Sequence, residues 1–210
     1  MLSETYRFIY LHVPKTGGNS IQTVLEPYSE DQRVVAESYQ DGIDRFQVLG
    51  PRTPTKHATL ADYHAVLGRG LAAYRRIISV RHPFARAVSY YFSPNRWMRQ
   101  EPDGRWVTLE AVWNPDAFLD FLDKIAPIAD FLTLDGAVQD PGHVVRYENL
   151  AADFDRVART LDLPCRSGDL PHVNRSTADP ALRAAAGADP AVRRAVEERF
   201  ARDMALFGYG

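Results

Sequence analysis

Short apolar runs alternate with amphipathic stretches along the chain. Residues 8–13 are almost continuously apolar or aromatic, a pattern typical of a strand that is buried on both faces. Residues 76–80 form a second such run and residues 144–145 a shorter one, with helical stretches between them. This alternation predicts βαβ units, and therefore a single α/β domain over residues 1–210 with a central, mainly parallel β-sheet flanked by helices.

Apolar residues three or four positions apart predict the helices. The first runs from Ile21 to about Leu25, with Asn19 or Ser20 as its cap, and Pro27 ends it. Further helices are predicted from about Leu60 to Leu67 after a Thr59 cap, from Pro83 to about Tyr91, around residues 118–125 and 150–161, and from Pro190 to about Ala205.

The remaining stretches are less regular. Short strands fit residues 33–35 and 46–49, where apolar residues are too few for a helix. Residues 93–115 are rich in Trp, Pro, Asn and Arg, and we expect a loop-dominated insertion there.

The segment between the first strand and the first helix has the features of an anion-binding loop. A helix N-terminus presents unpaired N–H groups and a positive partial charge, and glycines let the backbone approach an anion closely. The candidate residues are Lys15, Thr16, Gly17, Gly18, Asn19 and Ser20, of which the lysine adds charge and the hydroxyl and amide side chains add donors. The lysine precedes the glycines here, whereas it follows them in ATPases and GTPases, so a standard enzyme of those classes is disfavoured.

A second candidate site follows the second buried strand. Arg81 lies just beyond that strand, and Ser89 lies two helical turns further on. The carboxyl ends of neighbouring parallel strands share one crevice, so Arg81 and Ser89 are predicted to hold a second phosphate beside the first. Arginine suits this role because its planar group donates two hydrogen bonds to phosphate oxygens.

Composition narrows the function classes. The formal net charge is −2, so no global positive field attracts nucleic acid, although a local basic site stays possible. The chain has one cysteine, Cys165, which excludes an internal disulfide, and no metal site is predicted. The chain starts without a basic and apolar leader, and no apolar run approaches the ~18 residues of a membrane span. A cytoplasmic protein without integral membrane association is expected.

The motifs resemble those of a known family. Residues 15–20 resemble the 5′-phosphosulfate loop of sulfotransferases that use 3′-phosphoadenosine 5′-phosphosulfate (PAPS), and residues 79–91 resemble their 3′-phosphate element. Residues 56–59, 146–150 and 170–176 resemble segments of the branch that includes bacterial relatives and the heparan and uronyl 2-O-sulfotransferases. The resemblance spans most of the chain in the family's order. It differs at Asn19, where the family often has threonine, and at His82, where it often has aspartate or asparagine.

The resemblance implies a P-loop-NTPase-like sulfotransferase fold and a reaction. A sulfuryl group passes from PAPS to a hydroxyl of a carbohydrate-like or other small acceptor, and 3′-phosphoadenosine 5′-phosphate (PAP) is the product. His57 is implied as general base, and Lys15 stabilises charge on the oxygen that leaves. Residues 15–20 would hold the 5′-phosphate, Arg81 and Ser89 the 3′-phosphate, and Arg175, with His172 and Asn174, would close over the nucleotide. No metal is required.

Other interpretations stay open from the residues alone. A nucleotide-dependent kinase would need a lysine after the glycines and an acidic Mg²⁺ ligand, and neither is convincing. A module that binds a phosphorylated nucleotide without turnover is favoured if His57 points away from the loop. A polyanion-binding protein gains no support from the net charge of −2. His12 is expected to be a hydrogen-bonded core histidine, and the acceptor and oligomeric state are undetermined.

Overall fold

The computed structural model describes residues 1–35, 46–171 and 180–210. These residues divide into two compact units. The first unit contains residues 1–35, 46–81 and 128–171, and the second contains residues 82–127 and 180–210. His172, Asn174 and Arg175, predicted to cover a nucleotide, lie outside the described residues.

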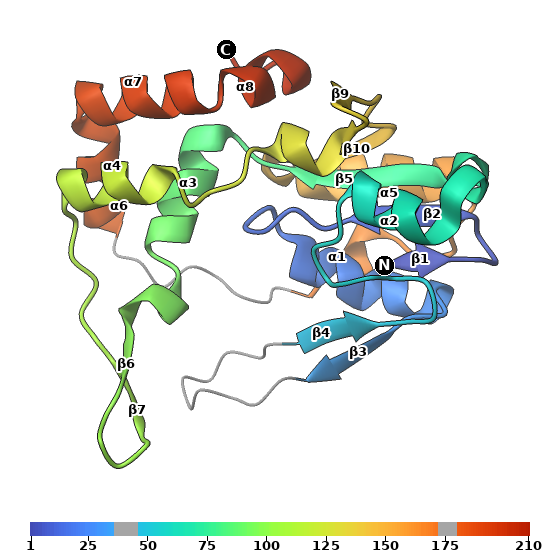
Figure 1. Cartoon of the computed structure of the whole chain (residues 1–210), viewed down its shortest axis with the longest axis horizontal. Helices are drawn as coiled ribbons and strands as arrows, with labels where there is room; N and C mark the ends of the chain where they lie inside the picture. Colours follow the sequence, from blue (N-terminus) through green and yellow to red (C-terminus); the bar gives the residue numbers. More distant parts are fainter. Residues whose placement is uncertain (36–45, 172–179) are drawn as a thin grey trace. The chain divides into compact units, whose positions relative to one another are not determined.

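A four-stranded sheet forms the centre of the first unit (Figure 1). Its order is β1 (Leu2–Ser3), β2 (Phe8–Leu11), β5 (Arg75–Val80) and β10 (His143–Arg146). Strands β2, β5 and β10 run parallel, and the short β1 is antiparallel to β2. Tyr10 of β2 and His143 of β10 both pair with Ile77 of β5, so the carboxyl ends of the three parallel strands lie at the same edge of the sheet. The predicted mainly parallel sheet is confirmed.

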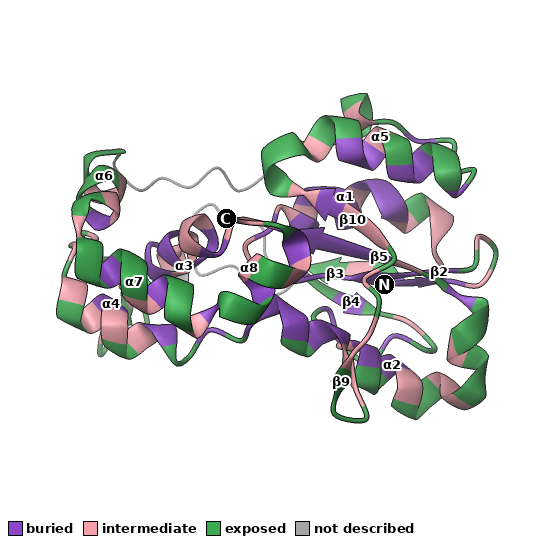
Figure 2. Cartoon of the chain, turned by 90° about the horizontal axis from the view of Figure 1, so that it is seen from above, coloured by how far each residue is buried: buried purple, intermediate pink, exposed green. Residues whose placement is uncertain are grey.

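Helices cover both faces of this sheet. Figure 2 shows α1 (Gly18–Leu25) and α5 (Leu150–Thr160) on one side and α2 (Leu60–Leu67) on the other. Buried apolar residues of α1 and α5, among them Ile21, Phe154 and Val157, pack against Tyr10 and Val145 of the sheet. Burial of each such large side chain contributes about 1.5–3 kcal/mol, so this face anchors the start of α1 to the ends of the strands.

The predicted cap is observed at the start of α2 but not at the start of α1. Thr59 caps α2, as predicted, and the helix has the predicted bounds. The prediction for α1 is wrong, because the helix begins at Gly18 with Gly17 as its cap, upstream of Asn19 and Ser20. Gly17 adopts a φ of 83°, a left-handed conformation that glycine reaches without strain, so the chain turns into the helix earlier than the side-chain rules suggest.

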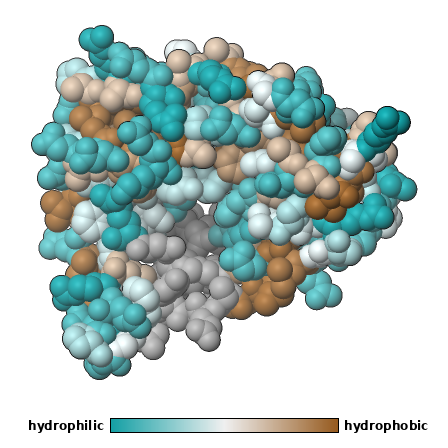
Figure 3. Space-filling model, in the orientation of Figure 1, coloured by the Kyte–Doolittle hydropathy of each residue, from teal (hydrophilic) through white to brown (hydrophobic). Residues whose placement is uncertain are grey.

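Small elements complete the first unit. The predicted strands β3 (Gln32–Val35) and β4 (Phe46–Leu49) pair antiparallel in a separate two-stranded sheet. Figure 3 shows apolar side chains gathered over this pair, where Val34, Val35 and Leu49 are exposed. Strands β8 (Thr133–Leu134) and β9 (Ala137–Val138) form another pair, and 3-10 turns occur at Glu26–Tyr28, Gly68–Ala73, Ile128–Leu132, Tyr147–Asn149 and Ser167–Asp169.

The second unit is helical. It contains α3 (Pro83–Tyr91), α4 (Pro115–Leu122), α6 (Pro180–Ala188), α7 (Pro190–Arg199) and α8 (Ala201–Phe207). Tyr91 is at the centre of its core, with Trp97, Trp113 and Phe118 arranged edge-on around its ring. Edge-to-face contacts of this kind stabilise aromatic clusters beyond their buried area.

Residues 93–115 are more ordered than the predicted loop. After a 3-10 turn at Pro94–Trp97, strands β6 (Met98–Gln100) and β7 (Trp106–Thr108) form an antiparallel hairpin (Figure 1). Trp97 donates its indole N–H to the carbonyl of Tyr91 at 3.0 Å, so the tryptophans that suggested a loop instead fasten the hairpin to α3.

The predicted last helix is broken. A single helix from Pro190 to Ala205 was expected, but the structure ends α7 at Arg199 and starts α8 at Ala201. A row of apolar residues every four positions drifts by about 40° per step around a straight helix. The break falls at the buried Phe200, and Asp203 and Phe207 are the buried residues of the short helix that follows.

Two negative observations apply to the described part of the chain. None of its helices combines the length and apolar character needed to cross a membrane. Within the same residues, no group of three or more His, Cys, Asp or Glu side chains could hold a metal ion.

Candidate active site

The loop between β2 and α1 has an unusual backbone. Lys15 has a φ of 70° and Gly17 a φ of 83°, so two of the three residues before the helix are left-handed. Only glycine reaches this region freely, and a lysine there costs on the order of 1–2 kcal/mol. Gly17 has no side chain to cap the first turn of α1. The chain therefore passes through two left-handed residues between β2 and the start of α1, which has no side-chain cap.

Each glycine of the loop has a neighbour that requires it. A Cβ on Gly17 would lie 3.1 Å from Cδ2 of Tyr147. A Cβ on Gly18 would collide with the ring of His12. The sequence predicted both glycines for close approach to an anion, and the structure adds that Gly18 makes room for a histidine of the protein itself.

The hydroxyl groups of the loop already have partners within the protein. Thr16 is buried and donates to the carbonyl of Val13 at 2.6 Å, and its oxygen also lies 2.6 Å from Ser79 Oγ. Ser20 donates to the carbonyl of Pro171 at 2.8 Å. Both hydroxyl groups therefore have partners within the protein, and a role of Thr16 and Ser20 in anion binding stays a prediction. Asn19 is half-buried, and its carbonyl accepts from Thr23.

His57 lies beside this loop. Its Nδ1 is 2.9 Å from the carbonyl oxygen of His12, and its ring centroid is 4.5 Å from that of His12. A carbonyl oxygen only accepts hydrogen bonds, so Nδ1 must carry a proton, and the neutral ring keeps its lone pair on Nε2. The side chain is also exposed. This tautomer and exposure are those of a base that meets a substrate.

The surroundings keep His57 neutral. The residue is exposed overall, but protein packed against part of its ring, including His12, removes water there and lowers its pKa below the ordinary 6.5; the hydrogen bond to His12 opposes this shift, and the charge of Lys56 adds to it. Lys56 is nearly buried, donates to the carbonyl of Phe46 at 3.0 Å and lies 3.6 Å above the Phe46 ring. Burial lowers the pKa of Lys56 to about 8.

Arg81 adjoins the same loop. Its Nη1 donates to the carbonyl of Lys15 at 3.4 Å, and its guanidinium lies 4.1 Å from the centroid of the Tyr147 ring. Tyr147 itself is 42% exposed, a large fraction for an aromatic ring that also touches the loop at Gly17. Residues 146–150 include Tyr147, but no local sequence pattern indicates its contacts with Arg81 and the glycine loop, which join segments far apart in the chain.

The predicted second phosphate site is divided between the units. Arg81 ends the first unit, and Ser89 lies half-buried on α3 of the second. Their joint contact with one phosphate stays a prediction. Within the second unit, Arg86 is 1% exposed and donates to the carbonyl of Ala126 at 2.9 Å. Asp203, also buried, attracts it. This buried arginine anchors the helix that carries Ser89.

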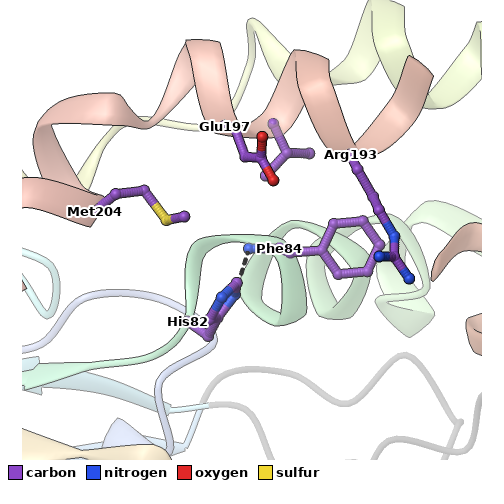
Figure 4. A pocket seen from close by; sticks show the side chains of 6 residues that line it. His82, Phe84, Arg193, Glu197 and Met204 are labelled. Atoms are coloured by element: carbon purple, nitrogen blue, oxygen red, sulfur yellow. Dashed lines mark hydrogen bonds between the residues drawn. The ribbon is translucent and has the colours of Figure 1, made fainter. Parts of the chain in front are cut away.

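The second unit also contains a cavity of about 230 Å³ (Figure 4). Its lining comes from the start of α3 and from α7 and α8, and comprises His82, Phe84, Arg193, Val196, Glu197 and Met204. The dashed line in Figure 4 is the hydrogen bond from the Phe84 N–H to Nδ1 of His82 at 3.2 Å. His82 thus caps α3.

One family of known proteins matches the chain over its full length. The family model described as "Sulfotransferase family" matches residues 1–210. No curated protein and no solved structure matches the chain.

Proposed function

The chain belongs to the sulfotransferase family, and we propose that it transfers a sulfuryl group from PAPS to a hydroxyl group, with His57 as general base. Membership makes it a transferase of sulfur-containing groups, and the family implies PAPS as the donor. The proposed acceptor is a carbohydrate or another small hydroxyl compound, in line with the resemblance to the 2-O-sulfotransferase branch. The single observation that carries the base assignment is the contact of His57 Nδ1 with the His12 carbonyl at 2.9 Å, next to the loop.

The residues at the loop suit a doubly phosphorylated donor. The cations Lys15 and Arg81 belong to the same unit, joined by the 3.4 Å hydrogen bond between them. The first turn of α1 has no side-chain cap, so its N–H groups are suited to an anion. When bound, PAPS supplies the sulfuryl group that is transferred. Lys15 and the backbone of Gly17, Gly18 and Asn19 would hold its 5′-phosphate, and Arg81 with Ser89 its 3′-phosphate.

Each residue has one task in the transfer. Sulfuryl transfer depends mainly on position and charge, as phosphoryl transfer does. Nε2 of His57 accepts the proton of the acceptor hydroxyl, a contribution of roughly 10²–10⁴-fold. The ammonium group of Lys15 offsets negative charge on the oxygen that leaves. His57 is exposed as a residue, which supports access of an acceptor to its ring.

Nucleotide binding tests the donor site. We would titrate PAP, AMP and ATP into the protein by calorimetry, and repeat the titration with Arg81→Ala. PAP should bind most tightly, and Arg81→Ala should remove most of its advantage over AMP. Arg69→Ala, an exposed arginine of the same unit, serves as the matched control and should change nothing. Equal affinity for PAP and AMP in the unaltered protein would contradict the donor site.

Turnover tests the base. With labelled PAPS and panels of oligosaccharide, phenol and aliphatic alcohol acceptors, His57→Gln should lower kcat by roughly 10²–10⁴-fold while PAP affinity stays the same. His64→Gln on α2 is the control histidine. Because the pKa of His57 is lowered, kcat/KM should be flat at neutral pH and fall only as the pH drops below about 6.5 and the ring gains a proton. Full turnover in His57→Gln would favour another base.

A further inference from the structure

His12 lies between the glycine loop and the proposed base. It follows β2 directly, and 4% of its surface is exposed. One side of its ring occupies the space that a side chain on Gly18 would need. The ring of His57 packs against it with the centroids 4.5 Å apart and the planes tilted by 55°. His12 therefore contacts both parts of the proposed active site.

The ring of His12 is fixed by its own partners. Its Nδ1 lies 2.8 Å from Oε1 of Gln22, which is buried on α1, and its ring stacks on Tyr10 at 6.0 Å. Nε2 of Gln22 is buried and has no hydrogen-bond partner among the described residues. An orphaned buried donor costs about 1–3 kcal/mol, so this packing is not optimised for stability alone.

The charged groups around His12 all favour a neutral ring. Burial lowers its pKa well below 6.5, and the neighbouring His57, Lys56 and the amino group of Met1 lower it further, while the hydrogen bond with Gln22 opposes them. Lys56 in turn is faced by Arg33. Among the described residues, no carboxylate contributes to this shift. A neutral ring shields the inner face of His57 from water without adding a charge.

We propose that His12 is a positioning residue for His57: its ring fills the space between Gly18 and the base and so fixes the base beside the donor loop. The proposal rests on the function proposed above. The backbone carbonyl of His12 holds Nδ1–H of His57, and the side-chain ring holds the plane of His57 and keeps water from its inner face. The ring itself exchanges no proton with substrate.

The first experiment measures the pKa of His57 by NMR from its ring Cε1–H signal, assigned by its absence in His57→Gln. In the unaltered protein the pKa should lie below 6.5. In His12→Ala it should rise toward the ordinary value, because water replaces the ring. In His12→Phe it should stay low, because an aromatic ring again fills the space.

Leu11→Ala is the matched control. Leu11 is the buried last residue of β2, directly before His12, and neighbouring side chains of an extended chain point to opposite sides, so its truncation should destabilise the unit and leave the ring contact between His12 and His57 in place. Thermal unfolding by circular dichroism identifies variants that remain folded. A folded His12→Ala protein whose His57 titrates as in the unaltered protein would overturn the proposal, as would a His12→Phe protein that behaves like His12→Ala.

Turnover and a double-mutant cycle give a second readout. His12→Ala should lower kcat by roughly tenfold or more with little change in the KM for PAPS, and His12→Phe should restore most of the lost kcat.

A double-mutant cycle tests the contact between His12 and Gly18. Gly18→Ala should lower kcat strongly in the unaltered protein but much less in the His12→Ala background, where the added methyl has room. Additive effects would contradict the packing role. The NMR result does not depend on turnover. Full activity of His57→Gln would therefore contradict the proposed role of His57 as base, while the NMR titration would still test whether His12 positions the His57 ring.

Discussion

The first turns of α1 and α2 differ in how their backbone N–H groups are satisfied. At α2, Thr59 accepts from the N–H of Asp62 at 3.2 Å, and the Asp62 carboxylate accepts from the N–H of Thr59 at 2.8 Å. This capping box satisfies the helix from within. At α1, the cap is Gly17, left-handed and without a side chain. The capping box of α2 occupies N–H groups of its own first turn and stabilises the helix. The first turn of α1 has no side-chain cap and is therefore suited to an external anion.

The charged residues near the two helix starts also differ in sign. Lys15 and Arg81 adjoin α1, whereas the first turn of α2 carries the acidic Asp62. An acidic residue there complements the helix dipole and would repel an anion. The comparison therefore favours α1 over α2 for the proposed nucleotide binding, and four variants test this distinction.

Replacement of Lys15 should have the largest effect. Lys15→Ala removes the charge nearest the proposed leaving oxygen and should lower kcat by roughly 10²–10³-fold, as measured with saturating PAPS. Lys15→Arg keeps a positive charge and should lose less. Lys124→Ala, an exposed lysine of the second unit, is the control. A fall in kcat of less than about fivefold in Lys15→Ala would remove this lysine from the reaction.

Gly17→Ala should have the next largest effect. Its left-handed φ of 83° is unfavourable for alanine by about 1–2 kcal/mol, and the added methyl would press on Tyr147 at 3.1 Å. Calorimetry should show PAP binding weakened by roughly tenfold, equivalent to about 1.4 kcal/mol. Gly68→Ala, at another positive φ with open space around it, carries at least as much backbone strain and should leave PAP binding unchanged. Equal losses of affinity in both variants would contradict a local role for Gly17.

Tyr147→Ala tests how the arginine is held. The guanidinium of Arg81 lies 4.1 Å from the ring centroid, a cation–π contact that contributes about 0.5–1 kcal/mol at an exposed site. Loss of the ring should therefore weaken PAP binding by roughly two- to fivefold. Tyr147→Phe keeps the ring and should bind normally. If the phenylalanine variant is as weak as alanine, the hydroxyl and not the ring is responsible.

Thr59→Ala should have the smallest effect on function. Loss of the cap should destabilise the first unit by about 1 kcal/mol, as measured by urea unfolding. PAP affinity should be unchanged, since α2 takes no part in binding. A loss of affinity comparable to that of Gly17→Ala would end the distinction between the two helix starts.

Local rules predicted the elements whose signals lie within a few residues. The apolar strands at residues 8–13 and 76–80, the Thr59 cap and the start of α3 at Pro83 all follow from nearest-neighbour chemistry. The hairpin at residues 98–108 was missed, because its short strands are stabilised by the Trp97 contact with α3 and not by their own pattern. The break at Phe200 was missed for a similar reason, since it serves the core of the second unit.

The sequence by itself determined which chemical groups are present and the order in which they occur: a lysine and two glycines between strand and helix, an arginine after the next strand and a histidine at residue 57. Only the tertiary structure decided how these groups are used. It gave the hydroxyls of Thr16 and Ser20 to partners inside the protein, placed Tyr147 on Arg81, and packed His12 between Gly18 and His57. These contacts join residues far apart in the chain, where local conformational preference carries no information and close packing selects the neighbours.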